Sequence, residues 1–191
     1  MIRKGTHVFG LLIPVFYVFV PRSITLAILL PLFIISFVID LARITELPLW
    51  TKFGVKLVGS IIRPSEKTSF TGATYILGTD FLVILMFDKP VALCAIAFIV
   101  LGDATAAMVG RRWGYHKYGN KSFEGSFGFF IASCLPAIII YNFYGSELPL
   151  FVGITGGLVA TIVEAFSVHS DDNMTVPLIS GFYMQIILAL I

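Results

Sequence analysis

Apolar residues fill most of the chain in long runs that short polar segments interrupt. Windows long enough to cross a bilayer, or nearly so, occur at about residues 6–21, 24–42, 70–87, 90–109, 125–143, 149–168 and 174–191. Because a helix satisfies its own backbone hydrogen bonds in lipid, these windows predict about seven transmembrane helices. We therefore expect an all-α, polytopic membrane protein in which residues 1–191 form a single domain.

One segment between the second and third windows has a different pattern. Its apolar positions recur at intervals of three and four residues, at Leu47, Trp50, Phe53, Leu57 and Ile61. Its polar positions on the opposite face are Lys52, Lys56, Ser60 and Arg63. This pattern predicts an amphipathic helix that lies in the membrane interface. Such a helix is either a surface strut between two spans or a gate through which lipids enter.

Positive charge sets the predicted orientation. If the N-terminus is cytoplasmic, the outside loops hold only Arg22 and Lys89, and the inside segments hold the other eleven of the 13 Lys and Arg residues. Short loops rich in Lys and Arg stay on the cytoplasmic side. Most polar groups able to do chemistry gather on the same side, whereas a transporter needs them along a path through the midplane. The pattern favours an enzyme whose active site faces the cytoplasm.

The composition excludes a soluble globular domain. The chain is 58% hydrophobic and 13% charged, whereas about a quarter of the residues of a soluble domain are charged. Cys94 and Cys134 lie within apolar windows and lack metal-ligand spacing, so we interpret them as small hydrophobic residues. Arg3 and Lys4 precede an apolar run, as in a signal peptide. No small-residue cleavage motif follows that run, so we expect a retained first helix.

Asp103 is the most informative residue, because it is a carboxylate inside an apolar window. An acid at the centre of a span costs roughly 2.5–3.5 kcal/mol on insertion scales, so one that is kept usually marks a functional site. Arg111 follows eight residues later, about 12 Å along a helix. It opens a basic loop with Arg112, Lys117 and Lys121. A carboxylate at this depth beside a cationic rim suits a metal ion that carries phosphates, although we interpret Lys117 only as a membrane anchor.

Small residues surround this acid and continue into the loop. They are Gly102, Ala106 and Gly110, at intervals of four residues, and then Gly114 and Gly119. The first three form a stripe that lets another helix approach closely, and such a stripe is more often helix packing than a site. Gly110 and the two later glycines leave the loop backbone flexible, with amides free to meet phosphate oxygens.

A motif of basic, hydroxyl and acidic residues stands at the start of the fifth window. It consists of Lys121, Ser122, Glu124, Gly125 and Ser126. The N-terminus of a helix is a natural anion site, because its first backbone amides have no partner within the helix. Together with Arg111 and Arg112, this motif predicts a site for phosphate groups.

A second acidic cluster, Asp171-Asp172-Asn173, follows the sixth window, and Glu164 lies near the predicted cytoplasmic end of that window. Carboxylates and an amide are hard oxygen ligands, and Mg²⁺ usually binds through one or two carboxylates plus substrate phosphates. A solvated turn is the alternative interpretation, since Asp and Asn favour turns. Because Asp103 and Glu164 are expected on the same side, we predict that both acidic regions converge on one cation.

Three further groups of charged residues lie on the predicted cytoplasmic side. They are Arg3 and Lys4 with His7, Asp40 with Arg43, and Arg63 with Glu66. Arg3 and His7 share a helical face, but a histidine at such a position is more often an interface residue than a catalyst. We interpret the two acid–base pairs as ion pairs rather than as ligands of a substrate.

Taken in order, these motifs resemble those of the CTP-dependent lipid-alcohol kinases: dolichol kinase, phytol kinase and the CTP-dependent diacylglycerol kinase. The most specific block comprises Gly102-Asp103, Gly110-Arg111, Gly114, Lys121-Ser122 and Glu124-Gly125-Ser126. Outlying matches are Arg3-Lys4 with His7, Glu66 with Gly72 and Tyr75, and Glu164 with Asp171-Asp172-Asn173 and Pro177. The motifs also resemble, more distantly, those of phosphatidate cytidylyltransferases. Residues 168–173 lack the glycines and the arginine of that family's C-terminal signature, which favours the kinase.

The resemblance implies an enzyme that uses CTP and Mg²⁺, or another divalent cation, to phosphorylate a polyprenol, a phytol-like isoprenol or a diacylglycerol. The expected partners are CTP, the lipid alcohol and the bilayer, and we expect no nucleic-acid partner. The membrane would be the cell membrane of a prokaryote or the endoplasmic reticulum of a eukaryote. Cytidylyl transfer to a phospholipid such as phosphatidate is the alternative reaction. A carrier or channel would have no ready use for the motif that begins at Lys121.

The candidate residues divide by the role that the resemblance implies. The cation would be held by Asp103 with Asp172 or Asp171. Phosphate oxygens would be bound by Lys121 and Arg111, with support from Arg112 or Arg43. The hydroxyl proton would pass to the other aspartate of the pair or to Glu164. No single residue is identified as the reader of the cytosine, and the candidates are Asn173 and the backbone of residues 121–126, which includes Ser122, Glu124 and Gly125.

Overall fold

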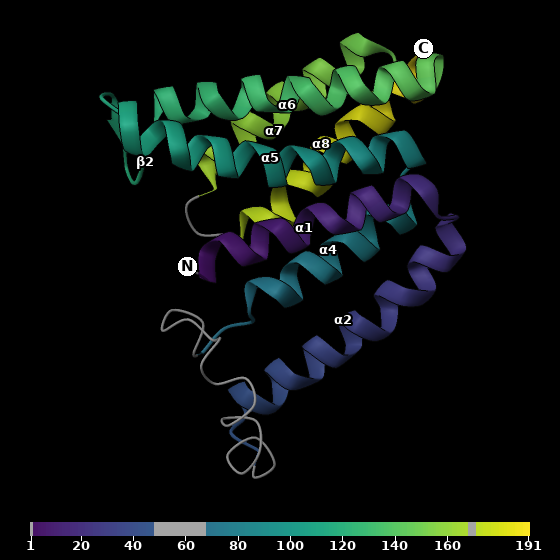
Figure 1. Cartoon of the computed structure of the whole chain (residues 1–191), viewed down its shortest axis with the longest axis vertical. Coiled ribbons are helices and arrows are strands. Elements are labelled where there is room, and N and C mark those ends of the chain that lie inside the picture. The colour runs from purple at the N-terminus through teal and green to yellow at the C-terminus, as the bar shows by residue number, and fades with distance from the viewer. Residues whose placement is uncertain (1, 48–67, 168–170) are drawn as a thin grey trace.

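A computed structural model describes residues 2–47, 68–167 and 171–191, with side chains from residue 10 onward (Figure 1). Within these ranges it has the seven helices α1 (Ile2–Phe19), α2 (Arg22–Ile44), α4 (Gly72–Met86), α5 (Lys89–Trp113), α6 (Phe123–Tyr144), α7 (Leu150–Phe166) and α8 (Asp172–Leu190). The strands β1 (Lys117–Tyr118) and β2 (Lys121–Ser122) join α5 to α6, and a 3₁₀ helix, η3 (Gly145–Glu147), follows α6. Each apolar window of the sequence thus corresponds to one helix.

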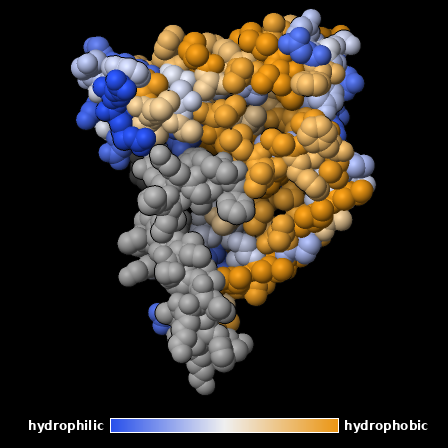
Figure 2. Space-filling model, in the orientation of Figure 1, coloured by the Kyte–Doolittle hydropathy of each residue, from blue (hydrophilic) through white to orange (hydrophobic). Residues whose placement is uncertain are grey.

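The helices run back and forth, so that the chain begins at one end of the bundle and finishes at the other (Figure 1). Among the described residues, α2, α5, α6 and α8 are long and apolar enough to cross a membrane, whereas α4, α7 and the part of α1 from Gly10 are shorter. Hydrophilic residues gather at the end where the hairpin lies and at the opposite end, and hydrophobic residues cover the face between them (Figure 2). This distribution is that of a helical membrane protein.

The predicted interfacial helix, apart from Leu47, lies outside the described residues and stays a prediction. α2 ends at Ile44, before that segment begins.

α5 is the central helix of the bundle. It contacts α1, α4, α6, α7 and α8, and all side chains of residues 91–96 are buried. Its small residues allow α6 to approach closely. A Cβ added to Gly125 of α6 would lie only 3.2 Å from the carbonyl oxygen of Ala106 and 3.6 Å from Cα of Gly110. The prediction that the stripe of Gly102, Ala106 and Gly110 serves helix packing is therefore confirmed.

α5 extends beyond the predicted window and ends at Trp113. Arg111 and Arg112 lie in its last turn, where cations are favourable because the C-terminus of a helix carries partial negative charge. The prediction that both arginines belong to a loop is wrong, as is the prediction that Gly110 makes that loop flexible. Gly114 ends the helix, and its N–H donates to the carbonyl oxygen of Gly110 at 3.1 Å.

A short hairpin follows α5, and the all-α prediction omits it. β1 pairs antiparallel with β2, so that Lys117 lies opposite Ser122. The turn between them is Gly119-Asn120, and Gly119 has a φ of 57°, which glycine adopts at little cost. Two residues beginning with glycine between short strands are a sequence signal for such a hairpin. The hairpin folds the polar segment back over the end of the bundle.

α8 begins at Asp172, so the acidic cluster predicted as a loop is the start of a helix. Asp171 is the N-cap residue. Its Oδ1 accepts hydrogen bonds from the backbone N–H of Asn173 at 3.0 Å and from Nδ2 of the same residue at 2.7 Å. Capping by an aspartate stabilises a helix start because it satisfies an amide that has no partner within the helix. Asp171 and Asn173 are thus occupied with each other.

Candidate functional site

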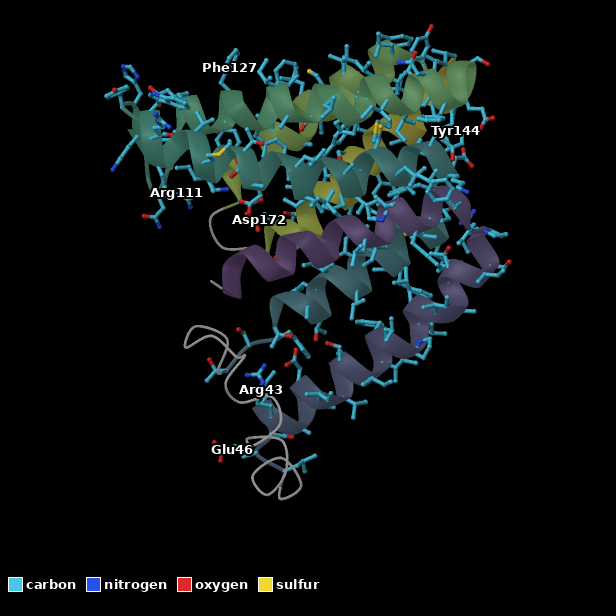
Figure 3. All side chains as sticks on the ribbon, viewed as in Figure 1. Arg43, Glu46, Arg111, Phe127, Tyr144 and Asp172 are labelled. Carbon is cyan, nitrogen blue, oxygen red and sulfur yellow. The ribbon has the colours of Figure 1, made fainter. Side chains whose placement is uncertain are left out.

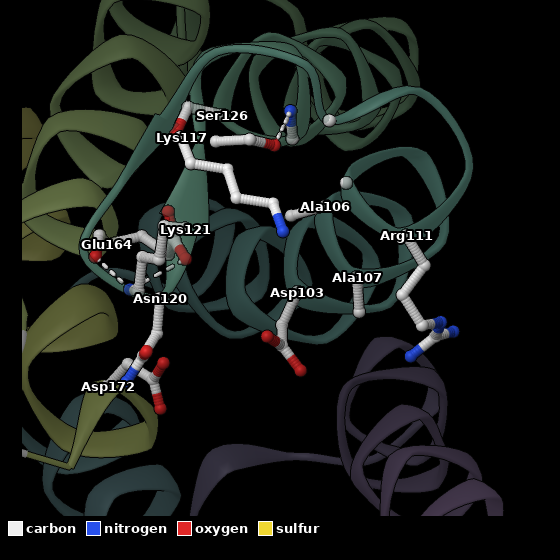
Figure 4. A pocket seen from close by; sticks show the side chains of 14 residues that line it. Asp103, Ala106, Ala107, Arg111, Lys117, Asn120, Lys121, Ser126, Glu164 and Asp172 are labelled. Atoms are coloured by element: carbon white, nitrogen blue, oxygen red, sulfur yellow. Dashed lines mark hydrogen bonds and ion pairs between the residues drawn. The ribbon is translucent and has the colours of Figure 1, made fainter.

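A pocket of about 640 Å³ lies where α5 ends, the hairpin turns back and α8 begins (Figure 4). Its lining residues are Asp103, Ala106, Ala107, Gly110, Arg111, Gly114, Lys117, Asn120, Lys121, Ser122, Gly125, Ser126, Glu164 and Asp172. They come from α5, the hairpin, α6, α7 and α8. The volume lies within the range of about 300–1,000 Å³ that is usual for small-molecule sites. Segments far apart in the sequence therefore form one binding space.

Two aspartates from different helices point into this pocket. Asp103 projects from α5, and Asp172 projects from the first turn of α8 (Figure 4). Both residues line the pocket, and Lys121 lines it beside them. Both aspartates are half-buried. The two acidic regions that the sequence predicts to meet therefore do meet in the structure, and their like charges repel unless a cation or a proton lies between them.

The carboxylates of Asp103 and Asp172 fit a hard divalent cation that a bound phosphate compound also helps to hold. In the part of the chain that the structure describes, no group of three or more His, Cys, Asp and Glu side chains forms a complete metal site. Mg²⁺ needs no such group, because it usually binds through one or two carboxylates, water and substrate phosphates. Asp103 and Asp172 supply two carboxylates from one side of the pocket. The pocket therefore suits a cation that arrives with phosphates.

Glu164, in the last turn of α7, holds Lys121 of β2. Oε1 of Glu164 lies 2.7 Å from Nζ of Lys121, and the ammonium group also donates to the backbone carbonyl oxygen of Glu164. Glu164 is only 4% exposed, and its Oε2 has no hydrogen-bond partner among the described residues. Because a buried carboxylate is costly without a counter-charge, this ion pair fixes both side chains at the pocket wall.

In the part of the chain whose side chains are described, three cations line the pocket: Arg111, Lys117 and Lys121. The side chain of Lys117 extends toward the middle of the pocket in Figure 4. The interpretation of Lys117 as only a membrane anchor is therefore incomplete. Asn120, which also lines the pocket, is absent from the predicted set. The Gly-Asn turn is the signal that could have found both residues, since it folds their strands back over α5.

Ser122 and Gly125 line the pocket and also build the N-terminus of α6. The Ser122 hydroxyl accepts a hydrogen bond from the backbone N–H of Gly125 at 3.1 Å, as an N-cap residue does. The backbone N–H of Phe123 donates to the carbonyl oxygen of His116 at 3.1 Å. Two amides that the sequence offers to phosphate are thus occupied within the protein. Phosphate binding would depend more on the side-chain cations than on the α6 N-terminus.

Two residues predicted to bind the nucleotide point elsewhere. The Arg112 guanidinium lies over the Trp113 ring, 5.0 Å from its centroid, and Arg112 does not line the pocket. The Glu124 carboxylate binds His116, with 2.7 Å between Oε1 and Nδ1, and it accepts a hydrogen bond from the backbone N–H of His116 at 3.2 Å. Glu124 thereby holds the segment before β1 against α6. Asp171 and Asn173, which cap α8, do not line the pocket either.

Asp40 and Arg43 form a separate polar cluster. Arg43 Nη2 lies 2.9 Å from Asp40 Oδ1, which confirms the predicted ion pair. The other carboxylate oxygen of Asp40 accepts hydrogen bonds from the backbone N–H of Thr71 and from the hydroxyl of Thr74, both at 2.7 Å. This network joins the end of α2 to the start of α4. Figure 3 shows Arg43 well apart from Asp172. The prediction that Arg43 supports phosphate binding at the pocket is therefore wrong.

The remaining predicted residues fall outside what the structure describes. This applies to the side chains of Arg3, Lys4 and His7 and to the whole of Arg63 and Glu66. The backbone of α1 begins at the same end of the bundle as the hairpin (Figure 1).

Asp80 is an acid that the sequence analysis omits, although it lies in an apolar window as Asp103 does. It is 3% exposed within α4, and its Oδ2 has no hydrogen-bond partner among the described residues. Asp80 is not among the residues that line the pocket. An acid within an apolar window therefore marks a buried position here but does not by itself mark the pocket.

The fold and the site together define a class of protein: a helical membrane protein with a charged pocket at one end of its bundle. The chain is 31% identical over 184 residues to an uncharacterised protein of Rickettsia prowazekii, covering 92% of this chain and 88% of that one. It is 26% identical over 172 residues to the CTP-dependent diacylglycerol kinase 1 of Schizosaccharomyces pombe, covering 82% and 78%. It is 38% identical over 92 residues to the phytol kinase of Synechocystis, covering 44% and 40%. No family model and no solved structure matches it. The chain belongs to the CTP-dependent lipid-alcohol kinase family.

The substitution Lys121→Met should destabilise the folded protein, because it leaves the buried Glu164 carboxylate without its cation. Removing one partner of a buried ion pair typically costs about 3–5 kcal/mol. The Lys121 side chain is 24% exposed, so we expect the lower end of that range. The measurement is the apparent melting temperature of the purified protein in detergent.

Lys117→Met is the matched control, because this exposed lysine lies on the other strand of the hairpin. It should melt near the wild-type temperature. The double substitution Lys121→Met with Glu164→Gln should recover most of the lost stability. Equal melting temperatures for Lys121→Met and Lys117→Met would contradict the importance of the ion pair.

Proposed function

We propose that the protein transfers the γ-phosphoryl group of CTP to the hydroxyl group of a lipid alcohol, with Mg²⁺ or another divalent cation bound in the pocket. The observation that carries this proposal is the meeting of Asp103 and Asp172 with three cations in one pocket at the end of an apolar bundle. Phosphoryl transfer needs mainly positioning and neutralisation of charge, which such a pocket can supply. Relatives named as a CTP-dependent diacylglycerol kinase and a phytol kinase support the donor and the class of acceptor.

In the proposed topology the protein crosses the membrane several times, with its N-terminus and its pocket on the cytoplasmic side. Positive charge supports this orientation, because Arg111, Arg112, Lys117 and Lys121 gather at the pocket end of the bundle. α1 begins at that same end, so the N-terminus and the pocket share one side (Figure 1). The pocket would then take a soluble nucleotide from the cytoplasm. The membrane is the cell membrane of a prokaryote or the endoplasmic reticulum of a eukaryote.

Asp103 and Asp172 are the residues that would hold the cation, which when bound supplies positive charge against the triphosphate oxygens. Arg111 and Lys121 bind phosphate oxygens through charge-assisted hydrogen bonds, which are about twice as strong as neutral ones. Lys117 extends into the same space and adds a third positive charge. With the triphosphate held at several points, the γ-phosphorus lies where an alcohol from the membrane can reach it.

In the proposed step the alcohol oxygen forms a bond to the γ-phosphorus, and the bond from that phosphorus to the bridging oxygen of the β-phosphate breaks. CDP leaves, and the hydroxyl proton passes to a carboxylate. Asp171 caps α8, and Asp172 shares the cation with Asp103, which leaves Glu164 as the acceptor of the proton. Glu164 lines the pocket, and its carboxylate is the proposed general base.

A labelling experiment separates this reaction from cytidylyl transfer. With CTP labelled at the γ-phosphate, the purified protein should transfer the label to an added lipid alcohol and release CDP. With CTP labelled at the α-phosphate, the lipid should stay unlabelled. Thin-layer chromatography of the lipid fraction measures both results. Transfer of the α-label with release of pyrophosphate would overturn the kinase proposal and favour the cytidylyltransferase.

A pair of neighbouring aspartates tests the assignment of the cation site. Asp172→Asn should lower kcat by at least about a hundredfold, because loss of one group that stabilises transition-state charge typically costs that much. Asp171→Asn is the matched control, since asparagine still caps a helix and this residue does not line the pocket. Its activity should stay within a few fold of wild type. The rate of CDP release measures both variants, and similar losses for both would contradict the assignment.

A pair of neighbouring arginines tests the phosphate site in the same way. Arg111→Gln removes a cation from the pocket lining, whereas Arg112→Gln removes one that lies over Trp113. A hydrogen bond to a charged group contributes about 1.5–3 kcal/mol, so the first variant should raise the KM for CTP by about ten- to a hundredfold. The second should change it by less than about threefold. An equal increase in KM for both would mean that the arginines act only through overall charge.

A further inference from the structure

An apolar groove of about 810 Å³ lies between α1, α2 and α4. Among the described residues that line it, only Thr25 has a polar side chain. α1 contributes positions from Gly10 to Phe19, α2 contributes positions from Thr25 to Leu32, and α4 contributes three positions near its start. α1 packs on α5 and α2 packs on α4, and the two diverge from the turn that joins them (Figure 1). The groove therefore faces the bilayer between α1 and α2.

One end of this groove comes close to the charged pocket. A Cβ added to Gly10, the first residue of α1 whose side chain the structure describes, would lie 3.2 Å from Cγ2 of Val100, so α1 rests against α5 at this part of the groove. Val100 precedes Asp103 by three residues, which is about 4.5 Å along the helix and places the two on neighbouring faces. Of the residues of α5 that line the pocket, Asp103 lies deepest in the bundle. The acidic end of the pocket and the inner end of the groove are thus about one helical turn apart.

The described part of the groove is long enough for a segment of an extended hydrocarbon chain. Gly10 and Phe19 are nine residues apart on α1, or about 13 Å along the helix axis. That distance is nearly half of the hydrocarbon thickness of a bilayer, which is about 30 Å. Its lining offers almost no hydrogen-bonding groups, so a peptide strand or a sugar would leave its own polar groups unsatisfied there. An alkyl or isoprenoid chain has no such groups.

We infer that this groove binds one hydrocarbon chain of the substrate alcohol, with the hydroxyl group toward the end of the bundle that holds Asp103. The inference rests on the proposed function and adds the place of the acceptor. A chain gains little hydrophobic free energy by moving from lipid tails into the groove, since both surroundings are apolar. The groove therefore orients the alcohol, and the polar end provides the preference for a hydroxyl-bearing lipid over other lipids.

Two substitutions on α2 test this assignment. Leu32→Trp places a larger side chain in the groove, whereas Ile35→Trp places one on the same helix outside the lining. The two residues are 46% and 57% exposed, so both tryptophans have room within the bilayer. We expect Leu32→Trp to raise the KM for a long-chain alcohol by at least fivefold and to leave the KM for CTP unchanged. Ile35→Trp should change neither constant, and an alcohol with a chain of a few carbons should not distinguish the two variants.

Photo-cross-linking of the wild-type protein gives a second readout that does not depend on the folding of a variant. The probe is a long-chain alcohol with a diazirine near the end of its chain. We expect adducts on peptides that carry Phe16 or Ile28, and an excess of the unlabelled alcohol should remove them. Adducts spread equally over Phe127 and Ile131 of α6, which are exposed elsewhere, would overturn the assignment. Adducts that an excess of phospholipid removes as effectively as the alcohol does would also overturn it. So would a cross-link that joins two copies of the protein.

The two levels of the proposal fail in different ways. If the wild-type protein transfers no γ-phosphate from CTP to any alcohol, the proposed function fails and the groove assignment fails with it. If the wild type is active and Leu32→Trp behaves as Ile35→Trp does, only the groove assignment fails.

Discussion

The structure brings two like charges, Asp103 and Asp172, to one half-buried place, and the rest of the pocket compensates for that repulsion. Lys121 lines the pocket together with both aspartates. Lys121 is itself held by Glu164 at 2.7 Å. The described lining residues comprise three acids and three bases, so these six charges balance. A triphosphate would therefore enter this pocket more favourably with a divalent cation than alone.

The backbone around the pocket is arranged so that the polar segment after α5 stays close to the helix end. A Cβ at Gly114 would lie 2.2 Å from the carbonyl oxygen of Gly110 and 2.8 Å from the hydroxyl of Ser122, so only glycine fits there. Ser122 in turn caps α6, and Glu124 binds the segment before β1. These contacts hold the lysines of the hairpin over α5. The motif that resembles a nucleotide site thus contains residues that build the pocket as well as residues that line it.

The sequence predicts the helices well, because hydrophobicity alone decides which segments prefer lipid. It predicts their ends poorly, since the charges at Arg111 and Asp172 end an apolar window although both residues are helical. Charges of these signs are favourable at those helix ends, so polarity does not distinguish a last turn from a loop. The choice between Asp171 and Asp172 also depends on the structure. Adjacent residues on a helix point about 100° apart, and the capping hydrogen bond decides which aspartate faces the pocket.

Along one side of α5, the lining changes from cationic to acidic to apolar within a short distance. Arg111 lies in the last turn, Asp103 lies deeper, and Val100 lies against the groove, so the whole change occupies eleven residues or about 16 Å. A reaction between a charged donor and an apolar acceptor requires such a gradient, because each reactant avoids the other's surroundings. The acids stand where the two surroundings meet, so in the proposed reaction the acceptor would react there while its chain stays in the bilayer.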